Sequence, residues 1–254
     1  MKNTFKGYWR LFQPIKNYLF KYPIELIGSY IKYAKSLQLY KKSGGSDAQF
    51  RYLAPQLYFK NEDVQTGGGH YFYQDIWALR KLNEIKPLMH YDIGSRFDGF
   101  VGQATAIAPV TCIDIRPPKF ILPDFHFIQG DILNLSFESS SLATLSCLHT
   151  IEHIGLGRYG DAINPNGFNE ALMELQRVVA KDGFLILSMP VGLERTEFNA
   201  QRVLSPLNCI KQLTEMALIE FSIVDENDNF ICNANPLDYI NSKYCCGLYL
   251  FKKK

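Results

Sequence analysis

Three side chains that can move protons lie close together near the middle of the chain, at His149, Glu152 and His153. Histidine titrates near neutral pH and often serves as a general base, and a neighbouring carboxylate can orient it. The three residues directly follow an apolar run, 142–148, that is typical of a buried strand. We therefore expect His149 or His153 to act as the base and Glu152 as its orienting partner. Capping of the loop by Glu152 and His153 is an equally good interpretation.

The same stretch has the spacing H-x-x-E-H, which on a helix binds zinc through its two histidines. Here it follows a strand, and Gly155 and Gly157 come within one turn, so the helix that the zinc motif requires is not expected. The six cysteines show neither a C-x-x-C pair nor another metal-ligand spacing. The sequence therefore predicts no metal site and no disulfide framework, and it favours a reducing cytosol.

Acidic residues also stand at the ends of earlier predicted strands. Asp92 lies near the end of 90–94, Asp114 near the end of 109–115, and Asp131 just after 125–129. Gly94 lets the backbone reverse without a Cβ clash, and Asp92 can order the turn through backbone N–H groups. A nucleotide-like ligand is expected at this break between strand and turn.

A polar, glycine-rich connection spans 155–167, and long loops of this kind are often functional. Arg158 is suited to a phosphate or carboxylate, and Tyr159 can cover a sugar ring. A surface loop tied by its own hydrogen bonds is the alternative. We expect three further residues at the same opening, namely His70, Asn199 and Arg202; for His70 a capping role is the alternative.

These residues must be positioned by a regular framework, and the hydrophobic periodicity supplies one. It predicts helices over 71–85, 97–107, 167–180 and 205–217, and strands over 90–94, 109–115, 125–129, 142–148, 184–189, 219–225 and 244–252. Their order implies an α/β fold, a Rossmann-like doubly wound sheet of seven mostly parallel strands. The last two strands lack a helical connection, so the last is expected to run antiparallel, inserted beside the fifth. The 181–183 turn is expected to end the 167–180 helix with a glycine.

The first 65 residues are predicted to form a basic helical extension, and residues 66–254 the α/β domain. Residues 1–42 carry nine Lys and Arg against Glu25 alone, a net charge of +8, which leaves −6 for the rest of the chain. The core is therefore unsuited to nucleic acid. The basic segment suits peripheral contact with the inner face of a membrane, or simple packing on the core. We expect a cytoplasmic protein with no spanning helix.

The ordered set of motifs resembles the class I S-adenosylmethionine-dependent methyltransferase fold over residues 66–254. Within that fold, four stretches look like an uncharacterised family associated with bacterial surface-polysaccharide genes and nematodes; they are 69–72, 92–96, 152–161 and 198–203.

This resemblance implies S-adenosylmethionine as cofactor and a set of residues that bind it. Asp92, Gly94 and Ser95 would surround its methionine and ribose portions, Asp114 with Ile115 would take the ribose hydroxyls, and Asp131 with Ile132 would hold the adenine. The chain departs from the Gly-x-Gly-x-Gly pattern of many such enzymes, because Arg96 and Asp98 follow Gly94. Cofactor binding then requires Arg96 to point outward or to pair with Asp98.

The implied activity is methyl transfer to a small polar acceptor, a sugar or sugar nucleotide of surface glycan biosynthesis. Two alternatives stay open. One is a different sugar modification on the same fold, and the other is a non-catalytic glycan-assembly protein that uses the basic segment for docking.

Overall fold

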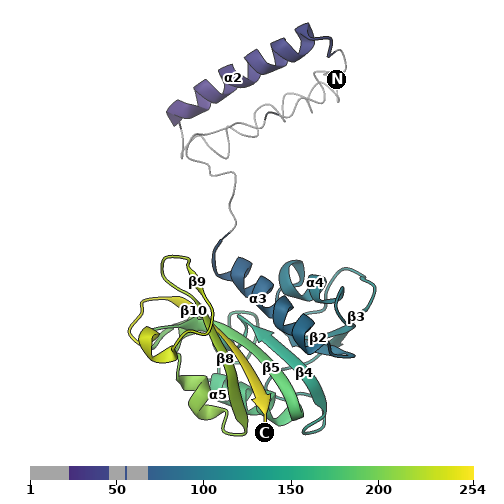
Figure 1. The fold of residues 1–254 in the computed structure, drawn as a ribbon, viewed down its shortest axis with the longest axis vertical. Coiled ribbons are helices and arrows are strands. Elements are labelled where there is room, and N and C mark those ends of the chain that lie inside the picture. The colour runs from purple at the N-terminus through teal and green to yellow at the C-terminus, as the bar shows by residue number, and fades with distance from the viewer. Residues whose placement is uncertain (1–22, 46–54, 56–67) are drawn as a thin grey trace. The chain divides into compact units, whose positions relative to one another are not determined.

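The structure, a computed structural model, describes residues 23–45, 55 and 68–254 (Figure 1). The chain divides into two units, Met1–Thr66 and Gly67–Lys254. In the first unit the described helix is α2, Pro23–Lys42. Its proline stands at the first helical position, where the missing N–H group has no helical partner to lose. The part of the predicted helical extension that precedes Pro23 lies outside the described residues.

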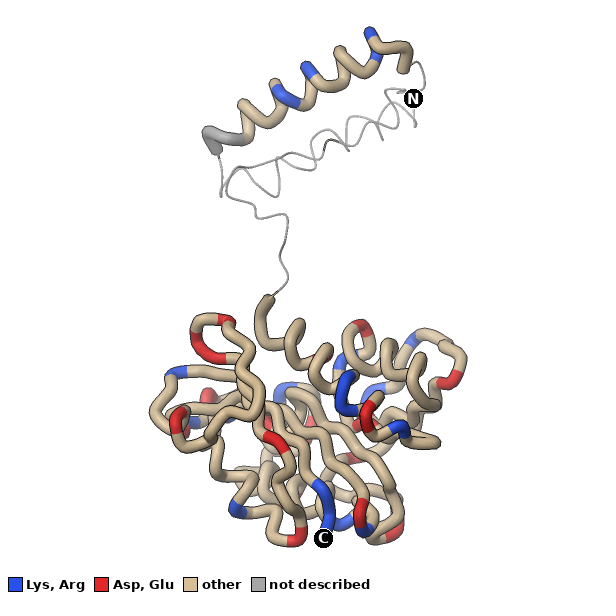
Figure 2. Tube along the Cα trace, viewed as in Figure 1, with Lys and Arg blue, Asp and Glu red and all other residues tan. Residues whose placement is uncertain are grey.

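Helix α2 carries both apolar and basic side chains on its surface. Leu26 is buried, whereas Ile27 and Ile31 are exposed, and Lys41 and Lys42 occupy the last turn. Basic positions recur along this helix in Figure 2, while both charge signs are interspersed over the second unit. Among the described helices, none combines the length and the apolarity that crossing a bilayer would need.

The second unit is built on an eight-stranded sheet with the order β3-β2-β1-β4-β5-β10-β8-β9 (Figure 1). The first five strands pair in parallel, and β10 runs antiparallel between β5 and β8, which confirms the predicted insertion of the last long strand beside the fifth. The eighth strand is the two-residue β9, which no sequence pattern indicated. The strands are β1 (His90–Ile93), β2 (Val110–Asp114), β3 (Phe125–Gln129), β4 (Leu142–Leu148), β5 (Val179–Val191), β8 (Met216–Val224), β9 (Phe230–Ile231) and β10 (Cys245–Lys253).

Helices cover both faces of this sheet, as a doubly wound fold requires. Helix α3 (His70–Ile85) packs through Trp77 and Leu82 into one apolar cluster, and α5 (Gly167–Val178) packs into a second. Side chains alternate between the two clusters along each strand. In β10, Cys245 belongs to the α5 cluster and its neighbour Cys246 to the α3 cluster.

Three predicted helices are shorter than the sequence suggested. The 97–107 region forms a wide π-type turn, Phe97–Val101, followed by α4, Gly102–Ala104, because Gly99 takes a non-helical conformation (φ −111°, ψ −106°). The 205–217 region keeps only α6, Asn208–Gln212, and strand β8 has already begun by its end.

Helix α5 ends at Val178, and the 181–183 turn lies inside β5 instead of capping the helix. Asp182, with a φ of 61°, provides the left-handed position that was expected of the glycine. Gly183 is needed for a different reason, since a Cβ there would lie 2.9 Å from the Ala143 carbonyl oxygen.

Two small elements complete the part of the domain that surrounds the site. The segment after β4 forms a single 3-10 turn, η3 (Ile151–His153), and a hairpin of β6 (Arg195–Glu197) and β7 (Gln201–Val203) follows β5.

Candidate active site

A cavity of about 680 Å³ lies beyond the carboxyl ends of β1 to β4. This volume is within the usual range for small-molecule sites. Strand β1 pairs with β2 on one side and β4 on the other, so the cavity covers the point at which the winding of the sheet reverses, where doubly wound folds bind ligands. The lining consists of Tyr71 and residues 93–98, 113–116, 130–133, 148–150, 153–154 and 159–162.

The turn after β1 is supported from behind by Asp92, which is fully buried and does not line the cavity. Its carboxylate accepts hydrogen bonds from the Ser95 backbone N–H (3.0 Å), the Ser95 hydroxyl (2.6 Å) and the Ser146 hydroxyl of β4 (2.5 Å). Burial raises the pKa of Asp92 to about 6. Asp92 thus orders the loop, as predicted, while Gly94 and Ser95 are the residues of this turn that reach the cavity.

Gly94 occupies a conformation that few other residues tolerate. Its φ is 65°, and a Cβ at this position would lie 2.7 Å from Cγ2 of Thr150. The turn and the segment after β4 therefore approach each other closely, and this contact shapes the cavity between them.

Arg96 pairs with Asp98, one of the two arrangements that the sequence required for cofactor binding. Nε and Nη2 of Arg96 donate to the two carboxylate oxygens of Asp98 at 3.1 and 2.8 Å. The guanidinium carbon lies 4.8 Å from the centre of the Tyr71 ring. The cation is thus neutralised and packed against an aromatic wall of the cavity.

Asp114 and Ile115 line the cavity at the end of β2, as predicted. Arg116, a residue that sequence reasoning missed, holds the Asp114 carboxylate by its backbone N–H (2.8 Å), Nε (3.1 Å) and Nη2 (3.0 Å). The guanidinium carbon also lies 4.6 Å from the centre of the Tyr159 ring. Oδ1 accepts two of these hydrogen bonds and Oδ2 accepts one, so Oδ2 retains a lone pair that can accept a hydroxyl. The sequence did contain a signal for this ion pair, because Arg116 follows the strand-terminal Asp114 by two residues.

Asp131 and Ile132 lie on the cavity wall after β3. Oδ1 of Asp131 accepts the backbone N–H of Leu133 at 2.9 Å, so this carboxylate shapes its own turn. Ile132 is buried beside it and provides an apolar surface.

His149 has a defined proton arrangement. The Ser188 hydroxyl donates to Oε1 of Gln74 at 2.6 Å, so at 3.2 Å it can only accept a hydrogen from Nδ1 of His149. The lone pair is then on Nε2, which is buried and has no hydrogen-bond partner among the described residues. The backbone of His149 is left-handed, with a φ of 47°, an uncommon conformation that often marks functional positions. Burial lowers its pKa to about 3, so the ring is neutral at pH 7.

Glu152 and His153 form a buried pair. Nε2 of His153 lies 3.6 Å from Oε1 of Glu152, which is longer than a hydrogen bond, and Nδ1 donates to the Ala200 carbonyl oxygen at 2.6 Å. Within the described part of the chain, neither carboxylate oxygen of Glu152 has a hydrogen-bond partner, and burial raises the pKa of Glu152 to about 8. His153 lines the cavity, whereas Glu152 does not. Because this segment is a 3-10 turn, the helical geometry of the zinc-peptidase motif is absent here.

The 155–167 loop is tied by its own hydrogen bonds, as the alternative interpretation anticipated. The Asp161 carboxylate accepts the backbone N–H groups of Gly155, Gly157 and Tyr159. Tyr159 lines the cavity, and Arg158 lies against its ring while Nη1 donates to the Ala200 carbonyl oxygen at 3.0 Å.

Of the predicted substrate residues, Tyr159 lines this cavity, whereas Arg158, Arg202, Asn199 and His70 do not. Arg202 is buried and donates to the backbone carbonyl oxygens of Ile154, Glu152 and Pro165, so its role is to hold the loop. Asn199 is exposed in the β6–β7 hairpin turn, with a φ of 63°. His70 is stacked on Tyr244, with ring centroids 5.3 Å apart, and lies beside His149.

Tyr71 and Thr150 also belong to the cavity wall, although sequence reasoning did not select them. Tyr71 follows the predicted His70 directly, and Thr150 follows His149. Their position next to chosen residues was the only signal, because neither side chain carries a distinctive chemistry.

Comparison with known proteins agrees with this architecture. The structure of YcgJ from Bacillus subtilis is similar with a TM-score of 0.52 at 11% identity, covering 72% of this chain and 98% of the other. The structure of the [4+2]-cyclase SpnF is similar with a TM-score of 0.52 at 11% identity, covering 77% of this chain and 85% of the other. The structure of a putative sarcosine dimethylglycine methyltransferase from Galdieria sulphuraria is similar with a TM-score of 0.50 at 13% identity, covering 72% of this chain and 86% of the other. The chain has the fold of class I S-adenosylmethionine-dependent methyltransferases.

At the level of sequence, a family model described as a Caenorhabditis protein of unknown function, DUF268, matches residues 136–235. The matched region runs from before β4 to just beyond β9 and includes His149, Glu152 and His153. Comparison with curated proteins gives no significant match.

Proposed function

We propose that the protein is an S-adenosylmethionine-dependent methyltransferase that acts on a small polar acceptor. The observation that carries this proposal is the cavity at the reversal point of a methyltransferase-type sheet, lined by Gly94, Ser95, Asp114, Asp131 and Ile132. These residues follow three adjacent strands, in the order in which the fold would present them to the methionine, ribose and adenine portions of the cofactor.

When bound, S-adenosylmethionine supplies a methyl group already activated by its sulfonium charge. The protein must then align the acceptor and accept its proton. We assign the proton to Nε2 of His153, since its Nδ1 hydrogen is committed to the Ala200 carbonyl oxygen. Glu152, when ionised, stabilises the imidazolium from 3.6 Å. His149 is the weaker candidate because its low pKa makes it a poor base.

For the acceptor we propose a sugar or sugar nucleotide, as in surface glycan synthesis. Tyr159 offers an aromatic face at the cavity, and the Arg116 and Arg158 side chains lie against it. An aromatic ring flanked by guanidinium groups suits a sugar ring that carries phosphate.

A different reaction on the same fold is the second candidate. It is favoured by the likeness to SpnF, whose name assigns it a [4+2] cyclisation, and fold alone does not fix chemistry. For location, we propose a cytoplasmic protein that touches the inner membrane face through residues 1–42, supported by the exposed Ile27 and Ile31 on basic helix α2.

Calorimetric titration with S-adenosylmethionine and S-adenosylhomocysteine tests the cofactor. We expect one saturable site in the wild type and a loss of affinity of more than about tenfold in Asp114→Ala, since the ribose loses its carboxylate acceptor. Glu138→Ala is the control, because Glu138 is exposed and does not line the cavity. Absence of binding by the folded wild type would reject methyl transfer and favour the second candidate.

A further inference from the structure

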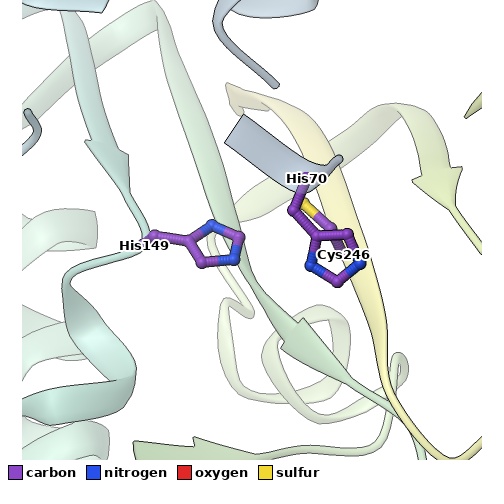
Figure 3. Close-up of side chains that lie close together, drawn as sticks. All are labelled: His70, His149 and Cys246. Atoms are coloured by element: carbon purple, nitrogen blue, oxygen red, sulfur yellow. The ribbon is translucent and has the colours of Figure 1, made fainter. Parts of the chain in front are cut away.

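Three side chains from segments far apart in the sequence converge beside the cavity (Figure 3). His70 is the first residue of α3, His149 follows β4, and Cys246 lies in β10. One potential ligand atom from each residue lies within 4.8 Å of the other two. Imidazole nitrogen and thiolate sulfur are the ligands that zinc takes most often in proteins.

His149 is already arranged as a metal ligand. Its Nδ1 hydrogen is fixed by Ser188, which is fixed in turn by Gln74, so Nε2 presents a lone pair without a partner. Metal-binding histidines usually have their other nitrogen held in this way, which sets both the tautomer and the ring orientation.

His70 is held with its ring parallel to that of Tyr244, at an interplanar angle of 9°. The Tyr244 hydroxyl accepts a hydrogen bond from Nε2 of Gln201 at 3.1 Å, which fixes the ring against which His70 packs. Burial lowers the pKa of His70, so its imidazole is neutral and able to coordinate a metal at pH 7.

Cys246 is fully buried, and its side chain lies in the α3 cluster, whereas that of Cys245 lies in the α5 cluster. Burial raises the pKa of the Cys246 thiol, and the charge of Glu152 acts in the same direction. Both carboxylate oxygens of Glu152 lack a hydrogen-bond partner in the part of the chain that the structure describes. A divalent cation would stabilise the thiolate and the nearby carboxylate together.

We propose that His70, His149 and Cys246 bind one Zn²⁺ ion through two imidazole nitrogens and one thiolate, with a fourth coordination position open. Ligand atoms in a tetrahedral zinc site lie roughly 3.5 Å apart, so binding would draw the three side chains together by about 1 Å. This site does not depend on the proposed methyl transfer. Since His149 also lines the cavity, the ion would lie at its wall, where water or an acceptor hydroxyl or thiol would complete the coordination.

The test is direct measurement of metal binding by the tag-free full chain. After removal of metals with a chelator, Zn²⁺ binding is followed by competition with a chromophoric chelator, and Co²⁺ is added separately as a spectroscopic probe. We expect one Zn²⁺ per chain and a thiolate-to-Co²⁺ charge-transfer band. Cys246→Ser should remove the band, and Cys246→Ser and His70→Gln should each weaken Zn²⁺ binding by more than about tenfold.

Cys245→Ser is the matched control, because it changes a neighbouring buried cysteine on the opposite face of the sheet. It should retain both the stoichiometry and the band. Thermal unfolding of each chelator-treated variant separates loss of ligands from loss of fold. Failure of the folded wild type to bind Zn²⁺, or equal losses in Cys245→Ser and Cys246→Ser at equal stability, would overturn the proposal, whatever the outcome of the cofactor titration.

Discussion

The carboxylate of Asp98 holds the guanidinium of Arg96 through two hydrogen bonds, of 3.1 and 2.8 Å. The pair lies on the turn after β1, where many enzymes of this fold have glycines instead. A cation at this place would repel a sulfonium, and the paired carboxylate cancels that repulsion. The departure from the glycine pattern is thus compensated within three residues.

Asp98→Asn should expose this compensation. The uncompensated Arg96 is expected to weaken binding of cationic S-adenosylmethionine by about threefold to tenfold relative to neutral S-adenosylhomocysteine. Titration of both ligands at low salt gives the ratio of affinities. The double variant Arg96→Gln/Asp98→Asn should restore that ratio, and an unchanged ratio in Asp98→Asn would mean that Arg96 does not influence the ligand.

Gly94→Ala should damage the turn in two separable ways. The left-handed backbone costs about 1–2 kcal/mol of stability with a Cβ present, and the new methyl group meets Cγ2 of Thr150. Thr150→Ser removes Cγ2, so the double variant should regain cofactor affinity while it keeps the backbone penalty. Denaturant unfolding and calorimetry measure the two effects, and equal cofactor affinity in Gly94→Ala and wild type would contradict this account.

Glu152 should make stability depend on pH in an unusual direction. Its folded pKa is raised to about 8 from 4.5, so between these values the folded state holds a proton that the unfolded state has lost. The free energy of unfolding should therefore fall as pH rises across this window, by at most about 1.4 kcal/mol per unit. Below about pH 6.5 the buried His149, with its pKa lowered to about 3, contributes a slope of the opposite sign. Denaturant titrations from about pH 6.5 to about pH 8, with chelator present, should therefore show the falling slope in wild type and not in Glu152→Gln.

Arg202 and Arg158 should differ in what they affect. Arg202 is itself buried, and Arg202→Ala leaves three backbone carbonyl groups without a charged donor, so we expect a loss of roughly 2–4 kcal/mol of stability. Arg158→Ala removes an exposed side chain and should change the free energy of unfolding by less than about 0.5 kcal/mol. The same change should weaken the binding of an anionic acceptor substrate. Comparing the unfolding free energies of the two variants checks this. Similar losses in both would refute the structural role of Arg202.

The strand framework was predictable from sequence because each strand is a short apolar run that ends in a turn signal. Cys245 and Cys246 illustrate this regularity, because neighbouring side chains of a strand point to opposite faces and these two lie in opposite clusters. Helix lengths were predicted less well. Gly99 breaks the helix near 97–107 through its own backbone conformation, which an apolar pattern does not report.

The candidate site was predicted where a residue's chemistry and its position at a strand end coincide, as at Asp114 and His149. The role of a residue was not predictable where it depends on the groups that the residue contacts in the folded structure. Arg202 has the chemistry of a substrate clamp, but burial commits it to backbone carbonyl groups. Cys246 has no motif around it, and only the pairing of β10 with β5 and β8 brings it near His70 and His149.

Strand β10 also determines the order in which the sheet can be assembled. It separates β5 from β8 and pairs with both, so the part of the sheet that contains β4 and β5 is joined to β8 only when this later segment inserts between them. Pairings between segments so distant in sequence form slowly. Because Cys246 is part of β10, the cluster of His70, His149 and Cys246 forms only after this insertion. Cobalt uptake during refolding would therefore time the last step of sheet closure.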